Sequence, residues 1–415
     1  MTPNEKNLLK HLDLINFWEP FDREIPKMRV TVSEILTDLR KKQREVKTNR
    51  DIVKSVEPRI FQAPFVFSFN TTNQRDALMP LFKALGEEAE LISENSDFTD
   101  RLLPDTYLKS EYLKFSSKML GWYYSFKNRD REVYRSRYYN FYRRLGQYNY
   151  YHTAFRKSKG NVKAYIASND HSGLSQVGFV AARRAGVPTI YIQHASVSEK
   201  FPPLRATLAL LDGEDAKEKY LSAGPTDTEI HLVGSMKYDA HLKNPAIHQK
   251  GILIGICIGL VYHDFEENFK LCQELERSGV PFCLRFHPLM DDQAKKKFID
   301  QGWEISPSDE KATDFIFRCH TIVSGDSNIL LEAIILKRRP LYFASDGLGV
   351  DYYGFVRHGV CEQTYFRYEE VLQALESNFD LDYHRQKAQR YNAVLGTEDE
   401  GKSTEKAIKS IKELR

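Results

Sequence analysis

The sequence predicts an α/β protein with two parallel-sheet domains that face one cleft. Short apolar runs, each typical of a buried strand, alternate with segments of helical period from residue 162 onward. Several of these runs end in polar clusters, and the same alternation starts again after a Pro-containing link at 243–250. Because parallel strands need crossover connections that are usually helices, we predict a Rossmann-like domain in each half.

The composition is that of a globular chain without polyelectrolyte character. Its 415 residues are 41% hydrophobic, which is enough for two or three ordinary cores. Lys and Arg number 60 against 57 Asp and Glu, so the net charge of +3 does not by itself attract nucleic acid or a membrane. The five cysteines lack CxxC spacing, which favours reduced thiols in the cytoplasm. No apolar run reaches the ~18 residues of a spanning helix, so we expect a soluble protein that can still touch the inner face of a membrane.

Residues 1–60 alternate charged and sparse apolar positions, and we predict a helical amino-terminal extension. The first domain is expected over 61–243. Its first strand is Pro64 to Asn70, followed by a polar loop and a helix over Asp76 to Leu85. Asn70 and Arg75 belong to that loop, so we predict that they contact an acceptor at the ligand edge of the sheet; a capped surface turn explains them equally well.

A Tyr/Arg-rich helical insertion is expected at about 105–160. Such interleaving is found in helices packed on a sheet with tyrosine hydroxyls at the rim, and also in surfaces that bind glycans, membranes or single-stranded nucleic acid. No nucleic-acid recognition motif accompanies the stretch, so we expect no nucleic-acid partner.

From residue 162 the strands and helices of the first domain are regular. A helix over Leu174 to Arg184, closed by Gly186, is expected after the first strand of this series. The strands are expected at Val162 to Ala167, Thr189 to Gln193, Leu208 to Leu211 and Ile230 to Val233.

The second domain is expected over 244–395, and a last helix within 396–415 is expected to cross back onto the first domain. The strands are expected at Gly251 to Leu260, Pro281 to Phe286, Trp303 to Ile305, Thr321 to Val323 and Pro340 to Phe343. The helices are expected at Asp264 to Ser278, Asp291 to Gly302, Ile329 to Lys337, Tyr368 to Asn378 and Lys402 to Leu414.

Two strand tips of the second domain are candidate donor sites. His287-Pro288 follows one strand, and the SGDSN stretch, residues 324–328, lies between another strand and a helix. A helix N-terminus preceded by Gly325 is a natural phosphate site, and a neighbouring histidine can bind the same phosphate. We therefore predict that these tips hold a nucleotide-activated donor. The predicted donor-binding residues here are Arg285, His287, Pro288, Ser324, Gly325, Ser327 and Asn328.

Each of these residues also has a structural alternative. A histidine before proline can simply satisfy a strand end, and Asp326 or Ser327 can cap the following helix. Arg285 lies two residues before His287 and therefore on the same face of the strand. It would either add charge to the site or form an interdomain ion pair.

Together the motifs resemble those of GT-B glycosyltransferases of bacterial surface polysaccharides. His287-Pro288 and the SGDSN stretch look like the HP and Ser-rich motifs with which Kdo (3-deoxy-D-manno-octulosonic acid) transferases and sialyltransferases bind CMP. Residues 234–239 look like the GNxKxD stretch of Kdo transferases, and 192–195 is similar to the QHG stretch of capsule and CDP-glycerol transferases, with Ala195 in place of glycine.

The resemblance covers about residues 160–345 and implies further donor-binding residues. Lys237 lies in the GNxKxD-like stretch, and Leu331-Glu332-Ala333 resembles the segment whose glutamate binds the donor ribose. An exposed helix carboxylate is the alternative for Glu332. Because Ser324 and Ser327 are not adjacent, as the serines are in many sialyltransferases, CMP, CDP and UDP all stay open.

A transferase must also remove a proton from the acceptor hydroxyl. Asp170, His171 and His194 follow strands of the first domain and are the candidate bases, although Asp170 is also suited to capping a helix. Asp239 and Asp170 are the candidate nucleophiles of a retaining reaction, and the alternative for Asp239 is a capping residue at the junction. Asp212 and Glu214 are weaker candidates.

We predict no metal and no cofactor other than the nucleotide-sugar substrate. The DxD pattern at 380–382 falls in an expected loop rather than at a strand tip. The predicted activity is transfer of Kdo or a sialic-acid-like sugar from a CMP donor to a glycan or glycolipid acceptor. The alternatives are a CDP-glycerol or UDP-sugar polymer transferase, a UDP-sugar epimerase of the same fold, and a non-catalytic binder of glycan or nucleic acid.

Overall fold

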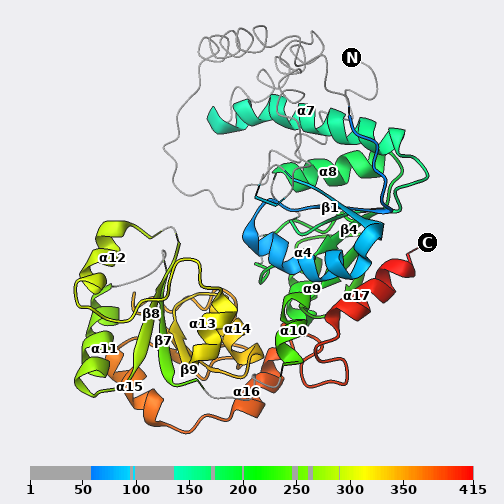
Figure 1. Ribbon diagram of the computed structural model, residues 1–415. Coiled ribbons are helices and arrows are strands. Elements are labelled where there is room, and N and C mark those ends of the chain that lie inside the picture. The colour runs from blue at the N-terminus through cyan, green and yellow to red at the C-terminus, as the bar shows by residue number, and fades with distance from the viewer. Residues whose placement is uncertain are drawn as a thin grey trace.

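The computed structural model describes residues 58–93, 97–98, 135–169, 173–198, 201–244, 251–259, 265–288 and 290–414. Within these ranges the chain forms two parallel α/β domains, which confirms the predicted fold class (Figure 1). Almost all of the predicted amino-terminal extension and the first part of the Tyr/Arg-rich insertion lie outside the described residues.

The first domain is built on a six-stranded parallel sheet with strand order β2-β1-β3-β4-β5-β6. Each strand is four residues long and, apart from the edge strand β6, almost wholly buried, as expected of a sheet covered on both faces. The strands are β1 Phe65–Ser68, β2 Ala89–Ile92, β3 Ala164–Ala167, β4 Thr189–Ile192, β5 Leu208–Leu211 and β6 Glu229–Leu232.

Helices cover both faces of this sheet, and Figure 1 shows the two layers clearly. One core joins the sheet to the helices α4 (Thr72–Leu85) and α17 (Ser403–Lys412), which lies side by side with α4. The other core joins it to α7 (Arg135–Lys157), α8 (Gly173–Arg184) and α9 (Glu214–Ser222). The chain therefore returns to the first domain at its carboxyl end.

The second domain has a five-stranded parallel sheet with strand order β11-β10-β9-β7-β8. Its strands are β7 Leu253–Ile258, β8 Phe282–Phe286, β9 Cys319–Ser324, β10 Arg339–Phe343 and β11 Thr364–Tyr365. Its helices are α11 Phe265–Arg277, α12 Asp292–Ile299, α13 Ala312–Arg318, α14 Ile329–Ile335, α15 Tyr368–Glu376 and α16 Leu381–Ala388. Between the sheets lie a short 3-10 turn η3 (Met236–Tyr238) and the helix α10 (Asp239–Leu242).

Most predicted strands are found within a residue or two, but several short elements were missed. No strand or helix was predicted at β2, α9, α13 or β11, and the start of α16 was expected to lie in a loop. That last prediction is wrong: the Asp380 side chain accepts a hydrogen bond from the Tyr383 backbone at 3.0 Å and caps α16. The expected strand at Trp303 to Ile305 is only an isolated bridge between Leu284 and Ile305.

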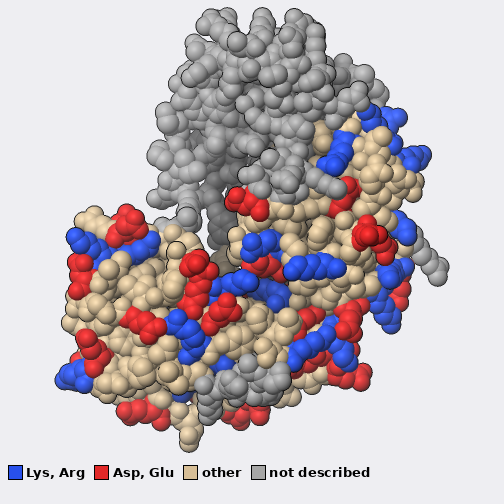
Figure 2. All heavy atoms as spheres, viewed as in Figure 1, with Lys and Arg blue, Asp and Glu red and all other residues tan. Residues whose placement is uncertain are grey.

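Charges of both signs are mixed over the face seen in Figure 2, and several basic side chains lie along the boundary between the two lobes. All five cysteines are buried and none forms a disulfide. Among the described residues, no helix has the length and apolar character needed to cross a membrane.

Candidate functional site

A narrow pocket lies where the carboxyl edge of the first sheet meets the second domain. Its walls come from the loops after β4, β5 and β6, from α14 and from the segment after α16. The lining residues are Gln193, His194, Ala195, Ser196, Asp212, Asp215, Ala216, Lys237, Tyr238, Asn328, Leu331, Ile335 and Tyr391. Ligands of open α/β sheets bind at this edge, so the pocket is the leading candidate site.

An ion pair and hydrogen bonds cross the pocket from one domain to the other. The Lys237 Nζ lies 2.9 Å from the Glu332 Oε1, and both side chains are mostly buried. The Asn328 Nδ2 donates to the same Glu332 oxygen at 3.1 Å, and the Ser196 Oγ donates to the Asn328 Oδ1 at 2.5 Å. Three predicted donor residues, Lys237, Asn328 and Glu332, therefore form one polar network.

The turn after β6 places Lys237 and Tyr238 in this network. Gly234 has φ of 78°, in the left-handed region, and a Cβ there would lie 2.6 Å from the Ser403 Oγ. The chain then forms η3, and the Lys237 Nζ lies 4.7 Å from the centroid of the Tyr238 ring. Burial, together with the nearby Glu332, raises the pKa of the Tyr238 hydroxyl well above its usual range.

Asp212, a weaker candidate on the sequence alone, is a titratable residue of the pocket. It follows β5, is half-buried and accepts a hydrogen bond from the Ser235 side chain. Burial raises the pKa of its carboxyl to about 7, although the Lys237 charge and the Ser235 hydrogen bond oppose this. A carboxyl that titrates near neutrality can accept or donate a proton during a reaction. The signal available from sequence was only its position directly after a buried strand.

His194 belongs to a loop that is organised by its neighbour Gln193. The Gln193 Oε1 accepts from the Asp212 backbone N–H at 2.9 Å, and its Nε2 donates to the Ala195 carbonyl at 3.0 Å. The amide side chain therefore connects the tips of β4 and β5. As a result, His194 and Asp212 line the same pocket.

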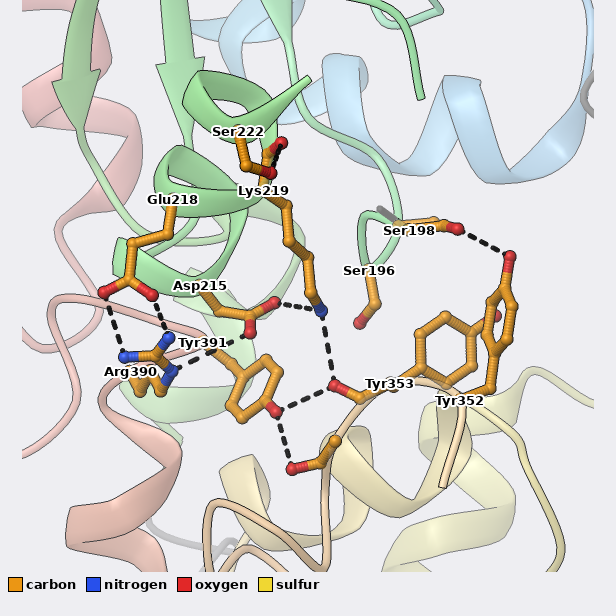
Figure 3. A network of polar contacts seen from close by, with 12 residues as sticks. Ser196, Ser198, Asp215, Glu218, Lys219, Ser222, Tyr352, Tyr353, Arg390 and Tyr391 are labelled. Carbon is orange, nitrogen blue, oxygen red and sulfur yellow. Dashed lines mark hydrogen bonds and ion pairs between the residues drawn. The ribbon is translucent and has the colours of Figure 1, made fainter. Parts of the chain in front are cut away.

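Beside the pocket, charged groups connect α9 to the second domain (Figure 3). The Lys219 Nζ lies 2.6 Å from the Asp215 Oδ2 and donates to the Tyr353 carbonyl at 3.3 Å. Arg390 pairs with Glu218, and its backbone carbonyl accepts from the Asp215 N–H at 3.0 Å. Lys219 and Asp215 are buried, so their pair within α9 is shielded from solvent, whereas the Glu218 side chain is 52% exposed. We call this set of contacts the interdomain anchor.

The structure does not bring His287 and Pro288 to the pocket. Both are exposed at the end of β8, and β7 lies between β8 and β9 in the sheet. Ser324 is buried, and its hydroxyl donates to the Cys257 carbonyl at 3.3 Å. Ser327 accepts from the Ile329 N–H at 3.4 Å, which is local turn geometry. Among the pocket-lining residues, Asn328 is the only one from the SGDSN stretch.

Several other predicted site residues have structural partners. The Arg285 guanidinium donates to the Ser306 Oγ at 2.7 Å and to the Glu310 carbonyl at 2.9 Å, within the second domain. It therefore supports the turn before α13, and the interdomain ion pair proposed as its alternative is not formed by these contacts. Gly325 is buried. Of the two capping residues proposed as the alternative for α14, Asp326 instead accepts from Tyr342 and Tyr352, whereas the Ser327 Oγ does accept from the N–H of Ile329, the first residue of the helix.

Asp239 caps a helix. Its Oδ1 accepts from the Ser403 N–H at 3.0 Å and its Oδ2 from the Thr404 N–H at 2.7 Å. Both carboxylate oxygens are used and only 8% of the residue's surface is exposed. Asp239 is therefore a capping residue, as its alternative interpretation expected, and lacks the geometry of a nucleophile. It joins the junction after β6 to the first turn of α17.

The predicted acceptor residues follow β1 at the carboxyl edge of the first sheet, where β3 separates β1 from β4. The Asn70 Oδ1 lies 3.0 Å from the Ser93 Oγ, and Arg75 pairs with the adjacent Asp76 at 2.8 Å. Neither lines the pocket. Asp170 and His171 lie outside the described residues. Among the residues that are described, no group of three or more His, Cys, Asp or Glu could hold a metal ion.

No protein-family model matches the sequence. The comparison with curated proteins finds no match either. The chain is, however, similar in structure to several solved enzymes. A putative UDP-N-acetylglucosamine 2-epimerase from Listeria monocytogenes aligns with TM-score 0.55 and 14% identity, over 85% of this chain and 96% of that chain. The UDP-GlcNAc 2-epimerase from Neisseria meningitidis, bound to UDP-GlcNAc, aligns with TM-score 0.55 and 12% identity, over 84% of this chain and all of the other.

The wall teichoic acid polymerase TagF aligns over 91% of this chain and 98% of that chain, with 12% identity and TM-score 0.49. That score is too low to bear on function. The two epimerase structures, at such low identity, establish the fold alone. The chain has the two facing parallel-sheet domains of the GT-B architecture.

Proposed function

We propose that the protein is a GT-B-type enzyme that acts on a nucleotide-activated sugar in the interdomain pocket. The observation that carries this proposal is the set of groups gathered there: Lys237, the near-neutral carboxyl of Asp212, and His194. A cation suits the phosphate of a nucleotide sugar, and the other two groups suit proton transfer at a sugar hydroxyl.

Transfer to a glycan hydroxyl is the reaction that we propose first. The acceptor oxygen attacks the anomeric carbon, its proton passes to His194 or Asp212, and the nucleotide leaves with the bonding electrons. Lys237 lies where it can offset the charge that develops on the leaving phosphate. Because Lys237 is paired with Glu332 at 2.9 Å, the bound phosphate would share the lysine with that carboxylate.

The nucleotide is proposed to be UDP or CDP before CMP. The CMP preference rests on the HP and Ser-rich motifs, and His287, Pro288 and Ser324 do not line the pocket. The similar structures with the higher TM-scores are UDP-GlcNAc 2-epimerases, one of them bound to UDP-GlcNAc. This similarity also makes epimerisation of a UDP-sugar, with no acceptor, the second candidate function.

Calorimetric titration with UDP-N-acetylglucosamine, CDP-glycerol and CMP tests the proposal. We expect one of them to bind, and Lys237→Ala to weaken its binding about tenfold through loss of a charged contact. Lys243→Ala is the matched control, because Lys243 pairs with Glu405 at 3.1 Å on the exposed surface. Absence of binding by all three ligands, or equal binding by both variants, would overturn the assignment of the pocket.

Product analysis then separates the two reactions. Incubation of the bound nucleotide sugar alone, followed by NMR, yields a second epimer if the protein is an epimerase. A transferase leaves the sugar unchanged until a glycan or glycolipid acceptor is added.

A further inference from the structure

The loop that carries His194 contacts the second domain at two separate points. We call residues 193–198 the His194 loop. The Ser196 Oγ donates to the Asn328 Oδ1 at 2.5 Å. The Tyr352 hydroxyl donates to the Ser198 Oγ at 2.7 Å, and Figure 3 shows this bond from the tip of the loop to the facing ring. The two contacts lie on either side of the buried Val197.

Both contacts originate in the SGDSN stretch after β9. Asn328 belongs to it and reaches Ser196 directly. Asp326, two residues earlier, accepts from the Tyr352 N–H at 2.8 Å through Oδ1 and from the Tyr342 hydroxyl at 2.8 Å through Oδ2. Asp326 therefore holds the backbone of Tyr352 through Oδ1, and through Oδ2 it holds the Tyr342 hydroxyl, which in turn accepts from the Asp351 N–H at 3.0 Å. Asp326 therefore has a structural role that differs from both phosphate binding and helix capping.

These contacts differ in kind from the interdomain anchor. They join neutral groups, and a hydrogen bond between neutral groups is weaker than one with a charged partner. The anchor uses charged groups: across the two domains Arg390 pairs with Glu218, its Nε lies 3.7 Å from the Asp215 Oδ1, and the Lys219 Nζ donates to the Tyr353 carbonyl at 3.3 Å. Because hydrogen bonds with a charged partner are the stronger kind, we expect the contacts of the His194 loop to open before those of the anchor.

We infer that Ser196, Ser198, Asp326 and Tyr352 are positioning residues that align His194 with the donor held by the second domain. The inference rests on the proposed function, because it assigns the aligned histidine to proton transfer. It goes further by coupling the acceptor-side base to the donor-side domain through two neutral hydrogen bonds. Closure of the domains would complete the site, and opening would displace His194 without dissociating the domains.

The first test needs no substrate. Tyr352→Phe removes only the hydroxyl and keeps the ring beside Tyr353, whose centroid is 5.0 Å away. Hydrogen exchange by mass spectrometry should show faster exchange in the His194 loop for Tyr352→Phe and for Ser196→Ala. Tyr383→Phe is the control, because Tyr383 is 49% exposed on α16. Unchanged protection of the loop in both test variants overturns the inference.

The second test uses the nucleotide sugar that binds in calorimetry. Tyr352→Phe and Ser198→Ala should each lower kcat about three- to tenfold, with donor Kd changed less than twofold, since alignment rather than binding is affected. The double variant should be no worse than either single one, because both remove the same bond. Unchanged kcat, an equal loss of donor binding, or additive losses would contradict the positioning role. If no nucleotide binds at all, the proposed function fails, while the exchange experiment still decides whether the loop contacts exist.

Discussion

At the scale of single residues, the fold exchanges the roles expected of two aspartates. Asp239 was a candidate nucleophile with capping as the alternative, and both of its oxygens accept backbone N–H groups of α17. Asp212 was the weaker candidate, yet it lines the pocket with a pKa of about 7. Asp212 directly follows the buried strand β5, whereas Asp239 follows η3, beyond the partly exposed edge strand β6. Neither position in the sequence shows which groups surround the carboxylate. The difference comes from segments distant in the chain that cover one carboxylate with N–H donors and leave the other facing a cavity.

The raised pKa of Asp212 predicts a pH dependence of nucleotide-sugar binding. The carboxyl is neutral below about pH 7 and negative above it, and the negative form repels a pyrophosphate. Wild-type Kd for UDP-N-acetylglucosamine should therefore rise roughly fivefold from about pH 6 to about pH 8. Asp212→Asn should bind with the low-pH affinity throughout. Calorimetric titrations in buffers from about pH 6 to about pH 8 measure the Kd of both proteins. If the Kd of Asp212→Asn rises with pH as steeply as that of the wild type, Asp212 is not the titrating group.

At the scale of elements, apolar strands were predictable and short polar helices were not. β3, β5 and β7 are continuous runs without polar side chains and are buried on both faces, so composition and length identified them. By contrast, α9 is highly charged, with only a weak apolar face, and its Asp215 and Lys219 are buried as a pair rather than exposed. Helical periodicity is absent when a helix buries an ion pair in place of apolar side chains.

The turn between β6 and η3 gives a prediction for the stability of these elements. Gly234 and Gly186 both have φ of 78°, but a Cβ on Gly234 would lie within 2.7 Å of three side chains, whereas one on Gly186 meets no atom within 4 Å. Gly186→Ala should therefore cost about 1 kcal/mol of unfolding free energy from backbone strain alone. Gly234→Ala should cost about 1 to 3 kcal/mol more through overpacking. Urea unfolding followed by circular dichroism measures both, and equal losses would show that the junction can relax.

At the scale of the whole molecule, the anchor beside the pocket holds the two domains in one arrangement. The exposed ends of both sheets were predicted to face a cleft, and the pocket is lined from both domains. The contacts that close the pocket include those between α9 and the segments around Tyr353 and Arg390. These segments are more than 130 residues apart in sequence, so no local pattern marks them.

Removal of the anchor's lysine should destabilise the whole protein. Lys219→Met leaves Asp215, which is 2% exposed, without its nearest cation and should cost about 3 kcal/mol. Lys217→Met, which breaks the exposed pair with Glu214 on the same helix, should cost less than about 1 kcal/mol. Calorimetric unfolding should therefore show a much larger drop in Tm for the first variant. Similar drops would mean that the buried pair adds nothing beyond a surface pair.

The sequence by itself determined the fold class and most strands, because burial on both faces demands continuous apolar runs that any parallel sheet displays. It also placed His194 at a strand tip and Asn328 at a helix start, two positions at the ligand edge, and the resemblance to GT-B transferases singled out Lys237 and Glu332. Only the tertiary structure decided which of the predicted residues share a pocket. It left His287 and Arg285 out, and it brought Asp212 in. The physical reason is that strand order and domain contact, which set these distances, depend on interactions between segments far apart in the chain.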